Sequence, residues 1–254
     1  MEIKWRFSLS PIYNPDLSTL AADLGHCNAN FNILCLEDDN GPYYEFNSDL
    51  LDELSEPNEV HKSAIQLKQL LDGILFLTFE ERTCLPTLGD LYNDDKRIIY
   101  EKALPAYHFE FEKYLNSEYK ATAKPVAHLL ELAKTEKHLR ELLYILGAPI
   151  SFRQLFIAFE TTQTLLNGDV AFKNLMGTEL NRRISLFTNV ANNYQAIGIE
   201  ARHRDLTRAL PKEEMSLDEA KNIIVAMVLV VIKHRYTIEL PYYKKIEINV
   251  SDLF

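Results

Sequence analysis

The sequence predicts an α+β protein in which a small layer of strands with one long helix precedes a four-helix bundle and a terminal strand. Two observations predict this order. Apolar and polar residues alternate with a period of two, as in half-buried strands, near both ends of the chain. Between residues 125 and 236 apolar residues instead recur at the spacing of amphipathic helices. We therefore divide the chain into an α+β region (1–120), a helical bundle (121–236) and a C-terminal strand (237–254).

Charge differs between the two halves of the chain. Residues 1–120 contain 10 Lys+Arg and 22 Asp+Glu, a net charge of −12, whereas residues 121–254 contain 17 and 15, a net charge of +2. The total net charge is therefore −10. An acidic surface repels a phosphate backbone, so we expect any nucleic-acid contact in the second half.

The sequence predicts a cytoplasmic protein without membrane contact. Its first residues, Met-Glu-Ile-Lys-Trp-Arg, lack the apolar run of a signal peptide. The longest apolar run, residues 223–232, is about half of the ~20 residues that a membrane-spanning helix needs. The 3 cysteines have no metal-ligand spacing and suit a reducing compartment. Because the sequence also lacks a Gly-rich phosphate motif, we expect neither a metal site nor a cofactor.

Strands are predicted in several parts of the first region. Residues 3–9 alternate Ile, Trp, Phe and Leu with polar residues, which indicates a half-buried strand. Residues 31–37 and 43–46 flank an Asp-Asp-Asn-Gly turn and therefore predict a hairpin. Residues 98–103 and 107–111 are predicted to form two further strands.

A long amphipathic helix is predicted between these strands, at residues 58–77, where apolar residues follow helical spacing. Gly73 lies inside this helix and costs it ~1 kcal/mol relative to Ala. A glycine at such a position indicates close packing against a neighbouring element. The first region is therefore expected to pack its strands on this helix.

The bundle is predicted from four helical segments with recognisable ends. Pro125 suits a first helical position, Gly147 follows the end of the first segment, and Ser151 suits an N-cap. Ser216 and Glu219 have the spacing of a capping box, in which each side chain satisfies a free backbone N–H. The four predicted helices span residues 125–146, 151–167, 178–194 and 216–235. Residues 238–250 are predicted to form a strand that joins the sheet of the first region.

A short pattern within the bundle carries a resemblance to known proteins. Ala191-Asn192 is followed by Gly198-Ile-Glu-Ala-Arg-His203, and then by Met215-Ser-Leu-Asp-Glu-Ala220 at the start of an apolar helix. This pattern resembles the C-terminal half of a group of uncharacterised bacterial proteins that share an Ala-Arg-His … Met-(Ser/Thr)-Leu-Glu-Glu-Ala signature. Most of those proteins have Gly after the His, where this chain has Arg204.

The helical region also resembles the HEPN superfamily, which is found in RNase toxins, their partners and defence proteins. This resemblance implies metal-independent RNA cleavage, in which a His moves the proton of the ribose 2′-OH and an Arg stabilises charge on the phosphate. Arg202 and His203 are the catalytic candidates under this hypothesis. They are adjacent, whereas the active members separate the two residues by four to six others, so the pair would have to converge through a turn.

A structural role for the same pair is the alternative. Arg202 and His203 follow Glu200 and suit the satisfaction of carbonyls at a helix end, as a buried polar staple. The polar residues around them are candidates for ligand binding, although nearby carboxylates also fit a solvated face of mixed charge. The binding candidates are Asn192, Asn193, Glu200, Arg204 and Arg183.

These observations lead to one preferred function and one alternative. The preferred hypothesis is a non-catalytic or weakly catalytic interaction or nucleic-acid-sensing protein, which the resemblance places in bacterial defence or a toxin–antitoxin system. The alternative is a metal-independent endoribonuclease that uses Arg202 and His203. The expected partners are RNA or another protein, together with a second copy of the chain bound through the bundle.

Overall fold

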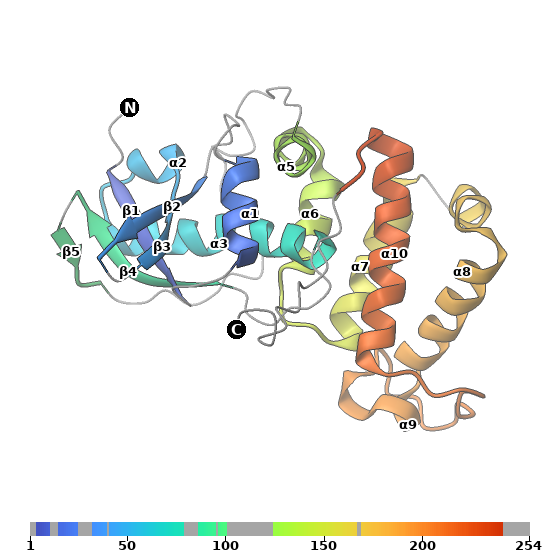
Figure 1. Ribbon diagram of the computed structural model, residues 1–254. Coiled ribbons are helices and arrows are strands. Elements are labelled where there is room, and N and C mark those ends of the chain that lie inside the picture. The colour runs from blue at the N-terminus through green and yellow to red at the C-terminus, as the bar shows by residue number, and fades with distance from the viewer. Residues whose placement is uncertain are drawn as a thin grey trace, which may run out of the picture.

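The computed structural model of the protein describes residues 4–10, 15–24, 32–39, 41–78, 86–94, 96–100, 124–166 and 169–240. It is an α+β structure in which an antiparallel sheet lies at one end and a group of helices at the other (Figure 1). This confirms the predicted fold class at that level. No helix in these ranges is long and apolar enough to cross a membrane.

The sheet has five strands in the order β2-β3-β1-β4-β5, and all neighbouring strands are antiparallel. Its strands are β1 (Trp5–Ser10), β2 (Asn32–Asp38), β3 (Gly41–Asn47), β4 (Thr87–Asn93) and β5 (Lys96–Ile98). The predicted first strand is confirmed as β1, and the predicted hairpin is confirmed as β2 and β3. The strand that comes first in the sequence therefore occupies the centre of the sheet.

The sequence predictions fail for several other elements of the first region. Strand β4 and the helices α1 (Pro15–Leu24) and α2 (Asp49–Asp52) were not predicted. Of the strand expected at 98–103, only Ile98 belongs to a strand, because β5 ends there and residues 99–100 form neither helix nor strand. The rest of that segment and the strand expected at 107–111 lie outside the described residues.

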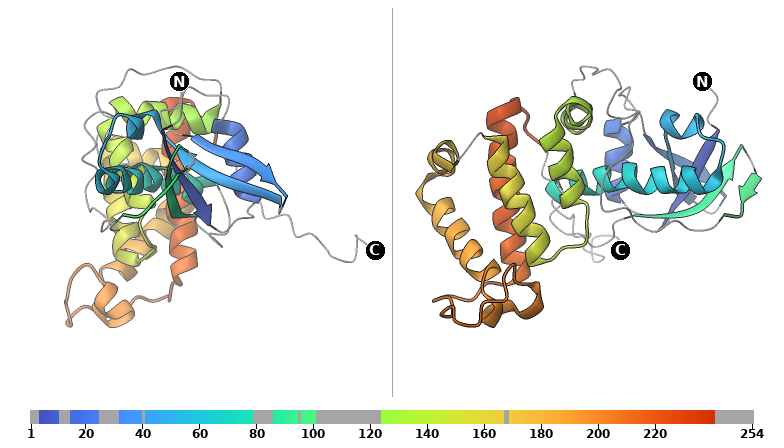
Figure 2. Two further views of the ribbon diagram at one scale, coloured as in Figure 1. Left: turned by 90° about the vertical axis from the view of Figure 1, so that its left-hand side faces the viewer. Right: turned by 180° about the vertical axis from the view of Figure 1, so that it is seen from behind.

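The long helix α3 (Pro57–Thr78) confirms the helix that was predicted at residues 58–77. Its first half packs against the sheet, where the rings of His61 and Phe7 lie 5.9 Å apart. Its second half leaves the sheet and reaches the helices, as the view from behind shows (Figure 2). All residues from Leu70 to Thr78 are buried, so this half of α3 is covered on every side.

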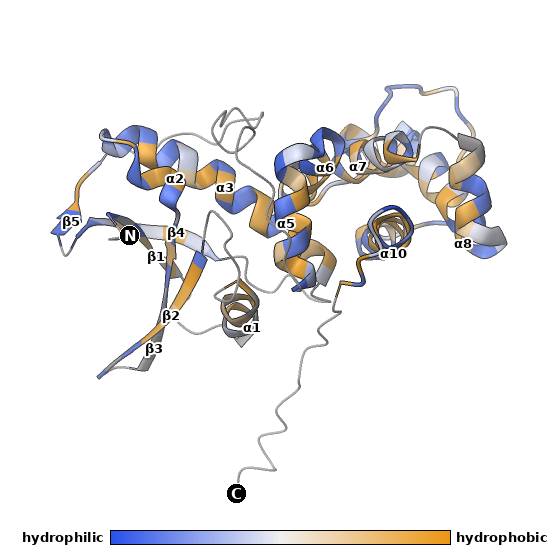
Figure 3. Ribbon diagram, turned by 90° about the horizontal axis from the view of Figure 1, so that it is seen from above, coloured by the Kyte–Doolittle hydropathy of each residue, from blue (hydrophilic) through white to orange (hydrophobic). Residues whose placement is uncertain are grey.

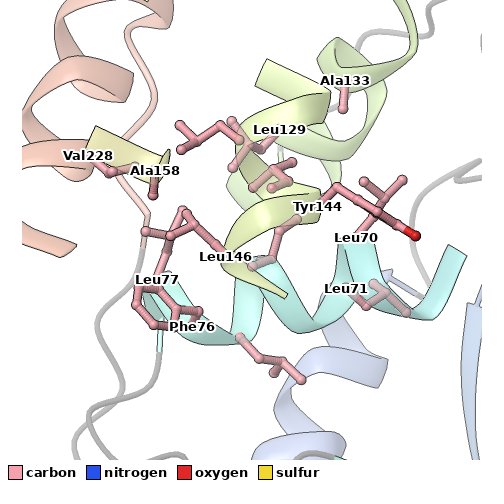
Figure 4. Packing of buried hydrophobic residues seen from close by; sticks show 14 of the residues in the cluster. Leu70, Leu71, Phe76, Leu77, Leu129, Ala133, Tyr144, Leu146, Ala158 and Val228 are labelled. Atoms are coloured by element: carbon pink, nitrogen blue, oxygen red, sulfur yellow. The ribbon is translucent and has the colours of Figure 1, made fainter. Parts of the chain in front are cut away.

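The helical part begins with two helices where the sequence predicted one. The chain leaves helical geometry at Glu136, in a polar stretch, so that residues 125–146 form α5 (Pro125–Thr135) and α6 (Lys137–Leu146). Helix α7 (Phe152–Leu165) is capped as predicted, because the Ser151 side chain accepts a hydrogen bond from the backbone N–H of Gln154. The buried side chains of α3, α5, α6, α7 and α10 (Leu217–Tyr236) meet in one core (Figure 4).

The helix expected at 178–194 is the second part of α8 (Asp169–Ala191). Gly177 has a φ of 67° and breaks α8, so that a helix starts again at Thr178 as predicted. The predicted end is wrong by three residues, because Asn193 caps a separate short helix, α9 (Tyr194–Ile197). The 3-10 helix η1 (Gly198–Glu200) follows α9.

Helix α10 is central to the helical part. Its predicted capping box is confirmed, with the Ser216 hydroxyl and the Glu219 carboxylate each bonded to the other's backbone N–H. Figure 3 looks along α10, which contacts both α7 and α8. Met227, Val228, Val231 and Ile232 are fully buried, as expected for the apolar run at 223–232. Residues 237–240 form no strand, and the remainder of the predicted tail strand lies outside the described residues.

Candidate functional site

The candidate residues lie in the connection between α8 and α10, apart from Arg183, which belongs to α8. This connection consists of Asn192, Asn193, α9, η1 and residues 201–216. We call residues 201–216 the 201–216 loop, and they contain no helix or strand. The connection lies at one end of α7, α8 and α10 (Figure 1). Loops longer than about 12–15 residues without secondary structure are uncommon in compact proteins and are usually functional or disordered.

Asn192 and Asn193 hold this loop in place. Asn193 is 1% exposed, its Oδ1 accepts a hydrogen bond from the Ala196 N–H at 3.2 Å, and its Nδ2 donates to the Ala209 carbonyl at 2.7 Å. The Asn192 carbonyl accepts a hydrogen bond from Nη1 of Arg208 at 3.2 Å. The two predicted binding residues therefore make internal bonds that order the loop, and Asn193 in addition lines the pocket described below.

Glu200 and Ala201 fasten the connection to the start of α7. An Oε2 atom of Glu200 accepts a hydrogen bond from the Phe152 N–H at 3.1 Å. Phe152 is the first residue of α7, so the carboxylate lies at the positive end of the helix dipole and satisfies a free backbone donor. The Ala201 carbonyl accepts a hydrogen bond from Arg153 at 3.4 Å. Glu200 thus has a structural partner in this arrangement.

Arg202 extends this attachment along α7. Its Nη2 forms an ion pair with Oε1 of Glu160 at 3.1 Å, and its guanidinium carbon lies 4.6 Å from the centre of the Phe156 ring. Its backbone N–H donates to the Ala191 carbonyl at the end of α8, at 3.0 Å. The Arg202 side chain is nevertheless 42% exposed. The expected buried staple is therefore wrong in burial, and its expected carboxylate, Glu200, is instead bonded to α7.

The remaining predicted residues are exposed to solvent. His203 makes no hydrogen bond with any residue that the structure describes, so the staple prediction is wrong for it as well. The Arg204 guanidinium lies 5.8 Å from the centre of the Tyr194 ring, as a cation–π contact. Arg183 lies near the start of α10, where its charge helps to lower the pKa of Glu219, after the larger effect of the hydrogen bonds from Ser216.

A pocket of about 420 Å³ lies between the second part of α8 and the 201–216 loop. This volume falls within the range of about 300–1,000 Å³ that is usual for ligand sites. Apolar side chains from both elements contribute to it, including Leu186 of α8 and Leu210 of the loop. The polar and charged side chains that line it are Arg182, Ser185, Asn189, Asn193, Arg208, Lys212 and Glu213. Arg202 and His203 do not line this pocket.

Three cations and one carboxylate line the pocket. Arg182 binds Glu179 through two hydrogen bonds of 2.9 and 3.2 Å, which lower the pKa of that carboxyl group. Arg208 uses one guanidinium nitrogen on the Asn192 carbonyl. Lys212 forms no ion pair with a described residue, and Glu213 contributes the opposing charge. Positive charges therefore outnumber negative ones among the residues that line the pocket.

Of the residues predicted from the sequence, Asn193 lines the pocket, whereas Arg202, His203 and Arg204 do not. Lys212, Leu210, Ser185 and Asn189 line the pocket and were not predicted. The signal that could have indicated the loop is the absence of any apolar periodicity between His203 and Met215. Within the described ranges, no group of three or more His, Cys, Asp or Glu side chains could hold a metal ion.

No known protein family matches the chain, and no curated protein or solved structure gives a significant match. The resemblance of the Ala-Arg-His pattern to uncharacterised bacterial proteins, and of the helices to HEPN proteins, therefore remains a prediction from the sequence.

Proposed function

We propose that this protein is a non-catalytic interaction protein that binds a partner macromolecule at the pocket between α8 and the 201–216 loop. One observation carries the proposal. Three large apolar side chains of the connection between α8 and α10 are strongly exposed, with Ile199, Leu206 and Leu210 at 84, 59 and 62%, and Leu210 lines the pocket. Exposed apolar groups beside arginines and a pocket are typical of the centre of a protein interface.

The contacts of Arg202 and His203 give less support to the alternative, an endoribonuclease. A cation that stabilises charge on a phosphate has to contact that phosphate. The Arg202 guanidinium instead pairs with Glu160 and stacks on Phe156. His203 lies in solvent and outside the lining of the pocket. The HEPN relationship and a place in bacterial defence remain proposals that rest on the sequence resemblance.

A photo-crosslinking amino acid at Leu210 tests the proposal. In an extract of cells that make the protein, it should form a discrete adduct, because Leu210 lines the pocket and is exposed. Asn189→Trp should abolish the adduct, since Asn189 lines the pocket from α8 and the indole would fill it. Asn174→Trp, at an exposed position of the same helix outside the pocket, is the matched control and should leave the adduct unchanged.

Two results would contradict the proposal. One is an adduct that persists in Asn189→Trp, because the partner would then bind elsewhere. The other is RNA cleavage by the purified protein that disappears in Arg202→Ala and His203→Ala while both variants keep the melting temperature of the parent. That second result would establish the endoribonuclease instead.

A further inference from the structure

We propose that the partner presents an acidic polypeptide segment with an apolar side chain, and that this side chain enters the pocket while its carboxylates pair with Arg208 and Lys212. The inference rests on the proposed function and names the chemistry of the partner. The apolar lining, the charges and the polar side chains of the pocket support it.

The apolar lining indicates an apolar anchor. Leu186 projects from α8, and Ala209, Leu210 and Pro211 come from the opposite side, in the loop. Leu210 is 62% exposed, so it remains largely in water although it lines a concave surface. An apolar side chain between Leu186 and Leu210 would remove apolar surface of both from water, which is the main favourable contribution in most protein associations.

The charges at the pocket indicate carboxylates beside that anchor. Arg182 is paired with Glu179, and Glu213 adds its own carboxylate to the pocket. Arg208 keeps donors beyond the one that it gives to Asn192, and Lys212 has no ion-pair partner within the described ranges. Arg208 also interacts with the carboxylate of Asp205, whose pKa it helps to lower, so Lys212 is the cation without a described partner. A carboxylate placed between Arg208 and Lys212 would meet both cations.

Uncommitted polar side chains suit a polypeptide backbone. Ser185 and Asn189 lie one helical turn apart on α8, and both are exposed at the pocket. The Ser185 hydroxyl donates to the Asn181 carbonyl at 2.8 Å, which leaves its oxygen free to accept. Together with the Asn189 amide, it could accept from a backbone N–H and donate to a backbone C=O, as an extended segment requires.

The same features disfavour RNA as the partner. Single-stranded RNA binds through cationic grooves with exposed aromatic rings on which its bases stack. The aromatic ring in this connection, Tyr194, lies beside the Arg204 guanidinium. The strongly exposed apolar side chain that lines the pocket, Leu210, is aliphatic.

Fluorescence anisotropy with the full chain tests the inference with four labelled probes of equal length. The first is a peptide of Glu and Asp residues with one central Leu. In the second, Ser replaces the Leu, and in the third, Lys replaces every acidic residue. The fourth is a single-stranded RNA of uridines. We expect the first probe to bind at least about tenfold more tightly than the other three, and to weaken between about 50 and 300 mM NaCl as paired surface charges are screened.

Variants of the chain locate the binding. Lys212→Glu should weaken the first probe by about tenfold or more, and Arg208→Glu should do the same. Lys212→Glu is the cleaner test, because Lys212 makes no described contact that holds the loop, whereas Arg208 bonds to Asn192. Lys173→Glu makes the same charge change at an exposed position of α8 outside the pocket and should have little effect.

Three outcomes would overturn the inference. These are equal binding of the Leu and Ser peptides, tighter binding of the RNA, or equal effects of Lys212→Glu and Lys173→Glu. If none of the peptides binds but the crosslink at Leu210 is still lost in Asn189→Trp, the inference of an acidic segment is wrong and the proposed function stands. A crosslink that persists in Asn189→Trp would contradict the proposed function itself.

Discussion

Gly73 of α3 and Leu143 of α6 are in direct backbone contact. A Cβ atom added at Gly73 would lie 2.0 Å from the carbonyl oxygen of Leu143. The contact is reciprocal, because a Cβ added at Gly147 would lie 2.0 Å from the carbonyl oxygen of Gln69 on α3. The Gln69 side chain also donates to the Tyr144 carbonyl at 2.8 Å. Two glycines therefore let the helix that leaves the sheet pack closely against α6.

Gly73→Ala should lower the free energy of unfolding by about 1–3 kcal/mol, the usual cost of overpacking, because the methyl group meets backbone atoms rather than a movable side chain. The higher helix propensity of Ala, worth about 1 kcal/mol, is too small to offset a displacement of α6. Urea denaturation measures the effect. Lys62→Ala, at an exposed position of the same helix, should stay within about 0.5 kcal/mol of the parent. A Gly73→Ala variant as stable as the parent would show that the two helices separate without cost.

Val228→Asp should unfold the helical part. Val228 is fully buried on α10, close to Ala158 of α7 (Figure 4), and an unpaired carboxylate there costs several kcal/mol. Circular dichroism and thermal melting measure the loss. Ala226→Asp, at an exposed position of the same helix, is the control and should remain folded. Cooperative melting of soluble Val228→Asp at the parent temperature would show that α10 is not part of the core.

The ion pair between Arg202 and Glu160 should contribute less than about 1 kcal/mol to stability, because both side chains are more than 40% exposed. A double-mutant cycle with Arg202→Ala and Glu160→Ala, followed by urea denaturation, measures the coupling between them. Arg202→Phe, which keeps an apolar contact with Phe156, separates the ring contact from the charge. A coupling energy above about 2 kcal/mol would indicate that the pair acts as the staple predicted from the sequence.

Tyr236 should make stability depend on alkaline pH. Burial raises the pKa of its hydroxyl from 10.0 to about 12, with a smaller contribution from the charge of Glu136 and an opposing one from Arg235. A folded-state pKa above the unfolded value stabilises the fold fully below about pH 10, and this contribution is lost as the pH rises towards 12. The parent should therefore lose stability relative to Tyr236→Phe between about pH 9 and pH 11 in urea denaturation. A constant difference across that range would contradict the raised pKa.

Elements with strong local signals could be predicted from the sequence, and elements that depend on distant partners could not. The capping box at Ser216 and the cap at Ser151 are local, and both predicted helix starts are confirmed. Strand β4 has one fully buried side chain, Leu91, and is a strand because it pairs with β1. Helix α1 was not predicted, although Leu17, Leu20 and Leu24 have helical spacing and are buried.

The candidate site shows the same division. The sequence indicated the chain segment because the Ala-Arg-His pattern and the polar residues around it are local properties. It could not indicate that Arg202 would meet Glu160, which is 42 residues earlier in the chain, or that Leu210 would face Leu186 across a pocket. Such pairs are set by how α7, α8 and the loop pack, and no spacing in the sequence encodes them.

The second half of α3 has a consequence for biosynthesis. Its residues are buried by partners that the ribosome makes much later. Helix α6 begins more than 50 residues after the end of α3. Lys221 of α10, whose Nζ lies 5.9 Å from the centre of the Phe76 ring, follows Phe76 by 145 residues. At a synthesis rate of about 5–20 residues per second, α10 is made roughly 7–30 s after Phe76 and its neighbours. During that interval an apolar helix with no permanent cover emerges from the ribosome. Nascent-chain aggregation, or its prevention by chaperones, should therefore depend on this one helix.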